Sequence, residues 1–184
     1  MILTISGPAG TGKTMLTKNL LAARDTFKIA TNVTTRAPRR DGDLPGDYLF
    51  VDEAGFDKLL AQGEIILPFL VHGKRYGTSK KIFFEALHSS DWYLWARMPQ
   101  ALVPLYEVAG ENKDKIRSVF LSAPAETELR RRLTARGDHD TLAIETRISD
   151  CRDWESYSRG LPLNIFFIPA GTPDETVRAV LKVL

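Results

Sequence analysis

Residues 7–14 have the types and spacing of a loop that binds a polyphosphate. The segment reads Gly7-Pro8-Ala9-Gly10-Thr11-Gly12-Lys13-Thr14 and matches the P-loop pattern at every fixed position. Glycines let the backbone wrap closely, so several N–H groups can point at one phosphate chain. Lys13 would supply a mobile positive charge to the β- and γ-phosphates, and the Thr14 hydroxyl would ligate Mg²⁺. The segment therefore predicts binding of a nucleoside triphosphate such as ATP.

A second group of polar side chains could hold a phosphate away from that loop. Thr34-Thr35-Arg36-Ala37-Pro38-Arg39 places two arginines around a rigid proline, and Tyr48 follows across a loop. A guanidinium binds phosphate through a planar fork, and a tyrosine hydroxyl adds a donor. Further along, Arg75-Tyr76-Gly77-Thr78 offers another aromatic and another small hydroxyl. These residue types fit a site for a second, non-transferred phosphate, but they fit a solvated basic loop as well.

Length and composition limit the other kinds of chemistry. The chain has 184 residues, of which 43% are hydrophobic and 26% charged, so a packed globular core is expected. The net charge of +2 argues against bulk binding to nucleic acid or to a membrane surface. A single cysteine, Cys151, excludes an internal disulfide and a cysteine-only zinc site. The histidines at 72, 88 and 139 lack the spacing of metal ligands.

No targeting or membrane-spanning segment is visible in the sequence. The apolar start at residues 1–6 is too short for a signal sequence, and the glycines after it interrupt the run. No apolar run approaches the roughly 20 residues of a membrane helix. We therefore expect a soluble, cytoplasmic protein, and the sequence leaves its oligomeric state open.

Strands and helices are expected to alternate along the chain. Strands are expected at 2–6, 27–34, 47–51, 65–71, 92–95, 116–121 and 164–168, and helices at 13–24, 53–62, 80–88, 99–108, 127–135, 142–154 and 174–184. The alternation predicts an α/β fold with a parallel sheet. Pro68 makes 65–71 an edge strand, and Pro104 should kink or end its helix. The stretch from 34 to about 87 is strand-rich and is expected to stand off the main sheet.

Further motifs, in order along nearly the whole chain, resemble those of guanylate kinases, a family of P-loop nucleoside monophosphate kinases. The similar segments are the P-loop at 7–14, TTRAPR at 34–39, GDYLFV at 46–51, GKRYGTS at 73–79 and LRRRLTARG at 129–137, with Arg147 at the place of a later lid arginine. The resemblance implies a parallel P-loop NTPase sheet flanked by helices, with an acceptor-binding insert and a helical lid. It implies one domain, with its core at 1–33, 88–124 and 155–184, the insert at 34–87 and the lid at 125–154.

The resemblance also implies a role for each matching residue. ATP would be bound by residues 7–14, with Mg²⁺ on Thr14, and the acceptor would be a nucleoside monophosphate. Acceptor-binding positions would be Asn32, Arg36, Arg39, Tyr48, Leu67, Tyr76 and Thr78. Positions acting in the transfer would be Lys13, Arg36, Arg132, Arg136 and Arg147. Three consecutive helix residues point in different directions, so Arg130 and Arg131 are expected on a solvated helix face. The balanced charge makes neither nucleic acid nor membrane an expected partner.

The chain departs from the family where the family recognises guanine. Counting on from Gly63-Glu64, Leu67 stands where a glutamate accepts hydrogen bonds from the guanine edge. Asn32 stands at the place of a serine near the base, and Thr78 could still donate to a base. Residues 94–97, Leu-Trp-Ala-Arg, replace a segment with two aspartates. The phosphate-binding residues are therefore kept, while most of the base-reading residues are lost.

Three functions remain open at this point. The first is a nucleoside monophosphate kinase that forms the diphosphate from GMP, dGMP or a related monophosphate. The second is a sugar phosphate kinase that resembles ribose 1,5-bisphosphate phosphokinase, an alternative that Arg39 and Tyr48 disfavour. The third is a non-catalytic binding module, and the intact Lys13-Thr14 pair argues against it.

Overall fold

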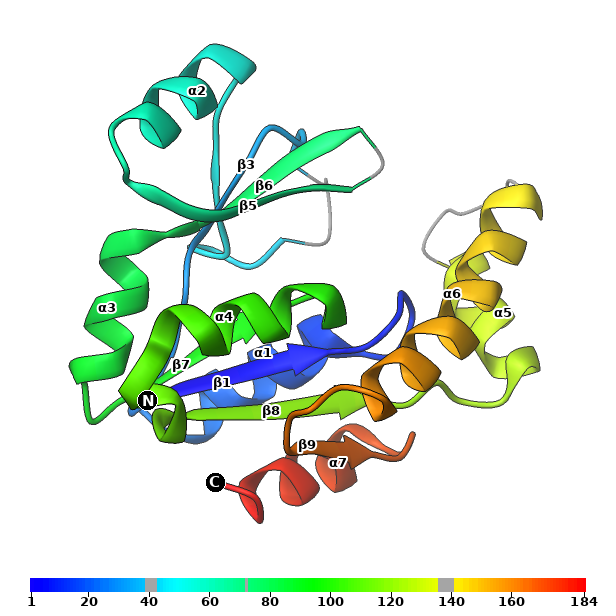
Figure 1. Cartoon of the computed structure of the whole chain (residues 1–184). Helices are drawn as coiled ribbons and strands as arrows, with labels where there is room; N and C mark the ends of the chain where they lie inside the picture. Colours follow the sequence, from blue (N-terminus) through cyan, green and yellow to red (C-terminus); the bar gives the residue numbers. More distant parts are fainter. Residues whose placement is uncertain (39–42, 72, 136–140) are drawn as a thin grey trace.

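A five-stranded parallel sheet forms the centre of the computed structural model, which describes residues 1–38, 43–71, 73–135 and 141–184 (Figure 1). Its strand order is β2-β7-β1-β8-β9, and all neighbouring pairs are parallel. The strands are β1 (Ile2–Ser6), β2 (Phe27–Ile29), β7 (Trp92–Ala96), β8 (Ile116–Leu121) and β9 (Ile165–Ile168). Every residue of β1 is buried, as expected for a strand covered on both faces. The predicted α/β fold with a parallel sheet is confirmed.

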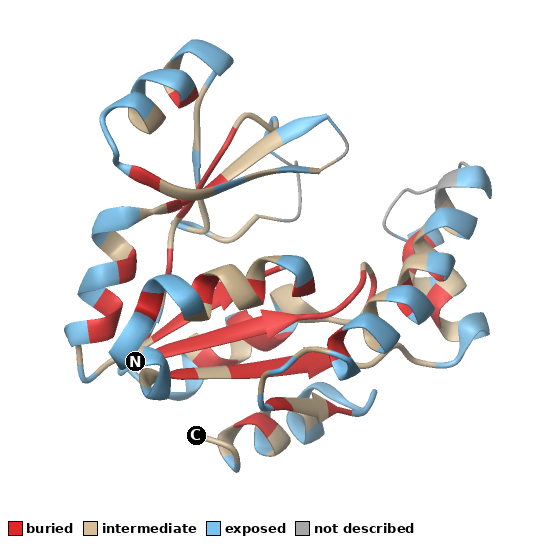
Figure 2. Ribbon diagram, in the orientation of Figure 1, coloured by how far each residue is buried: buried red, intermediate tan, exposed pale blue. Residues whose placement is uncertain are grey.

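Helices cover both faces of this sheet. On one face, α1 (Lys13–Ala23) and α7 (Pro173–Leu181) pack through Leu16, Leu20 and Val180 against Leu3 and Ile5 of β1. On the other face, α3 (Lys80–His88) and α4 (Leu102–Ala109) contribute to a cluster around Trp95. Figure 2 shows the resulting buried layer in red. Burying each large aliphatic side chain of this kind stabilises the fold by about 2 kcal/mol.

A four-stranded sheet lies above the main sheet in Figure 1. Its order is β4-β3-β6-β5, formed by β3 (Asn32–Thr34), β4 (Tyr48–Phe50), β5 (Ile65–Val71) and β6 (Lys74–Ser79). The helix α2 (Glu53–Ala61) begins at Asp52, whose carboxylate accepts from the Gly55 N–H, and buries Phe56 against Val33 and Ile65. The strand-rich stretch thus forms a sheet of its own, with β5 at its edge as expected from Pro68.

Two expectations about local structure are wrong. The single strand expected at 27–34 is two strands in different sheets, because the chain leaves the main sheet after Ala30, whose N–H still donates to the Leu94 carbonyl. The two residues between the strands, Ala30 and Thr31, include no glycine or proline that would mark the change. Pro104 does not end a helix. The 3₁₀ turn η1 (Pro99–Ala101) precedes α4, and Pro104 lies in the first turn of α4, where its missing N–H would have no intrahelical acceptor.

The helices α5 (Glu126–Ala135) and α6 (Thr141–Arg159) form a pair that extends to one side of the sheet in Figure 1. Leu129 and Leu133 of α5 pack with Ile148 and Cys151 of α6, and Ala9 of the glycine-rich loop joins them. The short 3₁₀ segment η2 (Gly110–Lys115) connects α4 to β8. Within the described residues, none of the helices has the length and apolar character needed to cross a membrane.

Candidate active site

The glycine-rich loop connects β1 to α1, so its backbone faces the N-terminus of a helix. Gly7, Gly10 and Gly12 have φ angles of 141°, 82° and 95°, which side chains rarely tolerate. A Cβ atom on Gly7 would lie 2.7 Å from the Leu121 carbonyl oxygen, and one on Gly10 would lie 2.7 Å from Leu129 Cδ1. Both glycines are therefore required by close packing as well as by the turn. The loop has the form that the sequence predicts.

The ammonium group of Lys13 lies over this loop. Its Nζ donates to the carbonyls of Gly7 at 2.6 Å and Pro8 at 2.7 Å, while the Thr11 hydroxyl donates to Pro8 at 2.9 Å. These contacts hold a positive charge beside the backbone N–H groups of the loop. Burial raises the pKa of the nearby Cys151 thiol to about 11, with the charge of Lys13 opposing part of that rise. The helix α6 thus passes close to the phosphate-binding loop.

The second sheet brings Arg36, Tyr48 and Tyr76 together. Asn32 pairs with Tyr48 across β3 and β4, and Thr34 pairs with Tyr76 across β3 and β6. The Arg36 guanidinium lies 4.9 Å from the centre of the Tyr48 ring, and the two tyrosine rings are 6.3 Å apart. Strand register therefore assembles one cationic and two phenolic side chains from three separate segments. This is the group that the sequence predicts for a second phosphate.

Asp43 is a member of this group that sequence reasoning missed. Its carboxylate accepts from both terminal nitrogens of Arg36, at 2.7 and 3.2 Å. Both side chains are largely buried, with 13% and 11% of their surfaces exposed. A carboxylate bound in this way occupies the two N–H donors of the guanidinium group that a phosphate would otherwise bind. The loop at 36–46 is rich in charges of both signs, and this is the only sequence signal that points to the pair.

Asn32 and Thr78 lie side by side at the base-recognition end of the predicted acceptor site. They are paired across β3 and β6, and both are buried. The Asn32 side-chain oxygen accepts from Trp95 Nε1 at 2.8 Å, and the Thr78 hydroxyl accepts from Arg97 Nη2. Among the described residues the Asn32 Nδ2 amide has no hydrogen-bond partner.

Leu67 lies in the irregular part of β5, beside Pro68. It has a φ of 51°, the only positive φ of a non-glycine residue in the described chain, and the register of β5 against β6 shifts between Ile66 and Phe69. Its half-buried side chain packs against the cluster that contains Phe83 and Trp95. The position therefore contributes apolar surface to the core and no hydrogen-bond acceptor.

Arg97, which the sequence marks only as a replacement for an acidic residue, is buried in the structure. Only 4% of its surface is exposed, and its guanidinium lies 4.4 Å from the centre of the Trp95 ring. Burial lowers its pKa to about 9, so it remains charged at neutral pH. Its Nε and Nη1 atoms have no hydrogen-bond partner within the described ranges.

Of the three arginines that the family resemblance assigns to a lid, the structure describes two. Arg132 donates to Glu128 at 2.7 Å and reaches the Gly10 carbonyl at 3.4 Å, so it contacts the loop. Arg147 lies on α6, and its carbonyl accepts from the Cys151 thiol. Arg39 and Arg136 lie outside the described residues.

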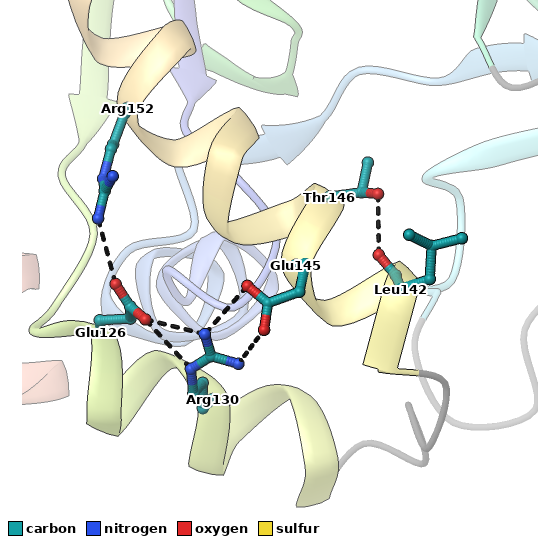
Figure 3. A network of polar contacts seen from close by, with 6 residues as sticks. All are labelled: Glu126, Arg130, Leu142, Glu145, Thr146 and Arg152. Carbon is teal, nitrogen blue, oxygen red and sulfur yellow. Dashed lines mark hydrogen bonds and ion pairs between the residues drawn. The ribbon is translucent and has the colours of Figure 1, made fainter.

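Arg130 and Arg131 lie on the exposed side of α5, as expected, but both are paired with carboxylates. Figure 3 shows Arg130 between Glu126 and Glu145, which joins α5 to α6, and Arg152 reaching Glu126 from α6. Arg131 pairs with Glu128, and the hydrogen bonds from Arg131 and Arg132 lower the Glu128 pKa to about 2. The pairs that join α5 to α6 are Arg130 with Glu145 and Arg152 with Glu126.

A family model for guanylate kinase matches residues 1–158. The chain belongs to the guanylate kinase family. It is 33% identical over 154 residues to the guanylate kinase of Nitrosomonas europaea. The aligned region covers 82% of this chain and 73% of that protein. It is 31% identical to the guanylate kinase of Zymomonas mobilis, over 100% of this chain and 82% of that one. A solved guanylate kinase from Anaplasma phagocytophilum shares 26% identity and a TM-score of 0.69, covering 100% of this chain and 83% of its own.

Membership in the guanylate kinase family, together with the intact loop, makes this chain an ATP-dependent phosphotransferase. The match with the family model ends at residue 158, so β9, the last strand of the parallel sheet, and the helix α7 lie beyond it. Leu67, Asn32 and Arg97, the departures noted in the sequence, lie around the predicted base-recognition end.

Proposed function

We propose that the protein transfers the γ-phosphoryl group of ATP to the phosphate of a nucleoside monophosphate, GMP, dGMP or a related one, and forms the diphosphate. The observation that carries the proposal is the presence of two separate phosphate-binding groups. One is the loop with Lys13 at the end of β1, and the other is the Arg36–Tyr48–Tyr76 group on the second sheet. Two such groups fit a reaction in which one phosphate attacks another.

On the donor side, the loop and α1 would bind the ATP phosphates. Lys13 would exchange its contacts with two loop carbonyls for the β- and γ-phosphates. Arg132, with Arg136 and Arg147, would stabilise the charge that spreads over the transferred group. In this proposal residues 125–154 act as the lid that excludes water, since hydrolysis of ATP is the competing reaction.

Mg²⁺ fits this site as a partner of ATP rather than as a metal held by an acidic cage. The hydroxyl of Thr14, in the first turn of α1, is a suitable single protein ligand. Within the described ranges no three His, Cys, Asp or Glu side chains gather into a metal-binding group. We propose that Thr14 and the ATP phosphates, with water, hold the ion, which would neutralise charge on the β- and γ-phosphates.

On the acceptor side, residues 34–87 would form the acceptor-binding insert. Arg36 would take the acceptor phosphate through its guanidinium fork, and Tyr48 and Tyr76 would add hydroxyl donors. Because Asp43 occupies that fork, an acceptor phosphate would have to displace it or share it. Arg39 would belong to the same group by its position in the motif.

The proposal is tested by steady-state kinetics of Arg36→Ala with both substrates varied. Loss of a ground-state contact to the acceptor should raise KM for the monophosphate at least about tenfold, while KM for ATP changes little. The matched control is Arg75→Ala, because Arg75 is on the same sheet but pairs with Glu53 and Asp57 of α2. An equal rise in both KM values, or a rise for ATP alone, would contradict the assignment of Arg36 to the acceptor.

A further inference from the structure

The predicted base-recognition end contains buried N–H groups that have no acceptor. Four buried side-chain atoms lack a hydrogen-bond partner within the described residues: Ser6 Oγ, Asn32 Nδ2, Arg97 Nε and Arg97 Nη1. Three of the four are nitrogen donors, and Asn32 and Arg97 are each only 4% exposed. Buried polar groups almost always have partners in native proteins, so a group of unsatisfied donors needs an explanation.

These donors lie where the two sheets meet. Arg97 directly follows β7 of the main sheet, and it donates to the Thr78 hydroxyl of β6 in the second sheet. Trp95 of β7 donates in the same way to the side-chain oxygen of Asn32, which is paired with Thr78 across β3 and β6. The charge of Arg97 also interacts with Tyr48, a member of the proposed acceptor-phosphate group. A monophosphate whose phosphate lies at Tyr48 would therefore bring its base toward these donors.

The acceptors beside these donors are already used within the protein. The Asn32 oxygen accepts from Trp95. The Thr78 oxygen accepts from Arg97. Leu67, which packs against the cluster that contains Trp95, adds apolar surface and no acceptor. A base at this end would therefore meet three N–H donors, while donor groups of its own would find few partners.

Nucleobases differ in whether two hydrogen-bond acceptors lie next to each other. Guanine presents O6 and N7 side by side, whereas adenine presents N7 beside its N6 amino group, which is a donor. An arginine that donates to O6 and N7 is the commonest base-specific contact made by proteins. Hypoxanthine has the same O6 and N7 and lacks only the 2-amino group of guanine. Unsatisfied donors without nearby acceptors therefore favour the O6–N7 edge and do not distinguish guanine from hypoxanthine.

The charge of Arg97 also needs a partner of opposite polarity. Within the described part of the chain no carboxylate contacts its guanidinium, which lies against the Trp95 ring and donates to Thr78. The group is still charged at neutral pH, because its lowered pKa is about 9. An unpaired buried charge is costly, and the electronegative O6–N7 edge together with the phosphate of the same ligand would offset that cost.

We propose that Arg97 and Asn32 recognise the acceptor base through O6 and N7, so that this chain takes 6-oxopurine nucleoside monophosphates and binds GMP and inosine monophosphate (IMP) alike. Leu67 stands where the family has a carboxylate that accepts from guanine, so the 2-amino group is not read. The inference rests on the proposed phosphotransfer and narrows its acceptor class. Arg97 is then a specificity-determining residue of the acceptor site.

Binding measured by calorimetry without ATP tests the inference independently of turnover. The probes are GMP, IMP, AMP, CMP and 7-deaza-GMP, which carries a C–H group in place of N7. The wild type should bind GMP and IMP within about threefold of each other, and both at least about tenfold more tightly than AMP and 7-deaza-GMP. A smaller preference over AMP or 7-deaza-GMP, or a larger difference between GMP and IMP, would overturn the proposal. Tighter binding of CMP, whose O2 and N3 are also adjacent acceptors, would overturn the assignment to purines.

Arg97→Met removes the guanidinium at nearly constant length. The variant should bind GMP and 7-deaza-GMP within about threefold of each other, because the contact to N7 is lost for both, and its affinity for AMP should change by less than about threefold. An arginine with a purely structural role would weaken all probes alike and leave the ratio of GMP to 7-deaza-GMP unchanged, which would overturn the proposal. Arg75→Met is the control and should keep the wild-type ratio, since Arg75 of the second sheet pairs with Glu53 and Asp57.

The wild-type measurements guard against a folding defect in the variant. Circular dichroism and melting temperature show whether Arg97→Met is folded. If it is not, the comparison of GMP with 7-deaza-GMP and IMP in the wild type still decides the proposal, because the atoms are changed on the ligand and not on the protein.

Failure of this inference is distinguishable from failure of the proposed function. If GMP and 7-deaza-GMP are phosphorylated with the same kcat/KM, the reading of O6 and N7 is wrong and the phosphotransfer stands. If GMP and IMP bind through Arg97 but no monophosphate is phosphorylated, the base recognition stands and the proposed reaction is wrong.

Discussion

Lys13 and Arg97 are two cationic side chains that differ in how many of their N–H donors have a hydrogen-bond partner. Lys13 donates to two carbonyls of its own loop, and these contacts hold its ammonium group in place. The ammonium group could exchange them for contacts with a bound phosphate. Arg97 is enclosed by a threonine, a tryptophan ring and main chain, and two of its nitrogens lack partners among the described residues. The first arrangement predicts a catalytic effect of mutation, and the second predicts an effect on acceptor choice.

Replacement of Lys13 by alanine should abolish phosphoryl transfer while the fold is retained. The lysine is placed against the negative charge of the β- and γ-phosphates, and each tenfold loss of rate corresponds to about 1.4 kcal/mol of lost stabilisation. Turnover with ATP and Mg²⁺ should be measured beside circular dichroism, with Lys18→Ala as control, since Lys18 is an exposed residue of the same helix. Activity of Lys13→Ala above about a tenth of the wild type would refute this role.

Replacement of Leu67 by glutamate should raise selectivity for GMP over other monophosphates. The position carries an apolar side chain where the family has a guanine-reading carboxylate, and a carboxylate accepts the N–H donors that leucine cannot. The measurement is kcat/KM for GMP, dGMP, AMP, CMP, UMP and dTMP in the wild type, Leu67→Glu and Leu67→Gln. A wild type that already prefers GMP more than about a thousandfold would show that guanine is read by another route.

The Cys151 thiol should resist alkylation at pH 8. Its pKa is raised from 9.0 to about 11 by burial, so the thiolate fraction at pH 8 falls from about 10% to about 0.1%. The chain has one cysteine, so modification by iodoacetamide reports on this residue alone. Its rate should be at least about 100-fold slower than in urea-unfolded protein. Because the unfolded thiol loses its proton first, this group should lower stability as pH rises from about 9 to 11.

The sequence predicts loop residues and motif arginines better than it predicts what surrounds them. Glycine, lysine and threonine at 7–14 have fixed roles in a phosphate loop, and strand register brings Arg36 to Tyr48 as expected. The pairing of Arg36 with Asp43 and the burial of Arg97 depend on tertiary contacts that no local pattern encodes. Arg39 and Arg136 stay predictions.

At the scale of elements, the helix pair α5–α6 and the phosphate loop are packed as one unit. Leu129 of α5 lies where a Gly10 side chain would be, and Ala9 joins the apolar cluster of the two helices. The charged pairs of Arg130 hold α6 against α5 on the outside (Figure 3). Changes in the packing of α5 should therefore be transmitted to the ATP site.

Replacement of Gly10 by alanine should weaken ATP binding at least about tenfold and lower the melting temperature. The new Cβ would meet Leu129 Cδ1 at 2.7 Å and would adopt a φ of 82°. Gly46→Ala is the matched control, because Gly46 also has a φ of 82° but nothing within 4 Å. Adding Leu129→Ala should restore part of the ATP affinity, as a double-mutant cycle would show. If the double variant binds no better than Gly10→Ala, the clash with α5 is not the cause.

Most elements were predictable, and the two errors have a physical origin. Periodicity and caps place α1, α2 and α7, the last with a capping box between Thr172 and Glu175. The strand expected at 27–34 is wrong because no glycine or proline marks the point after Ala30 at which the chain changes sheets. The expectation for Pro104 is wrong because a helix tolerates proline in its first turn. The sequence does not show that α4 begins at Leu102, only two residues before the proline.

At the scale of the whole molecule, the two groups that we propose to bind phosphate are on two different sheets. The ATP loop follows β1 of the parallel sheet, and Arg36, Tyr48 and Tyr76 follow or belong to β3, β4 and β6 of the second sheet (Figure 1). The two sheets are joined through residues 30–31 and through α3. This division explains why donor-side and acceptor-side substitutions should affect different KM values.

The central claim is that this chain moves a phosphoryl group from ATP to another phosphate. The most direct measurement follows the label of [γ-³²P]ATP in the presence of Mg²⁺ and each acceptor, with products separated by chromatography. The account predicts that the label appears in a phosphorylated acceptor together with ADP, that it depends on Mg²⁺, and that it is lost in Lys13→Ala. Label that appears only as inorganic phosphate, or stays in ATP with every nucleoside monophosphate, would contradict the account.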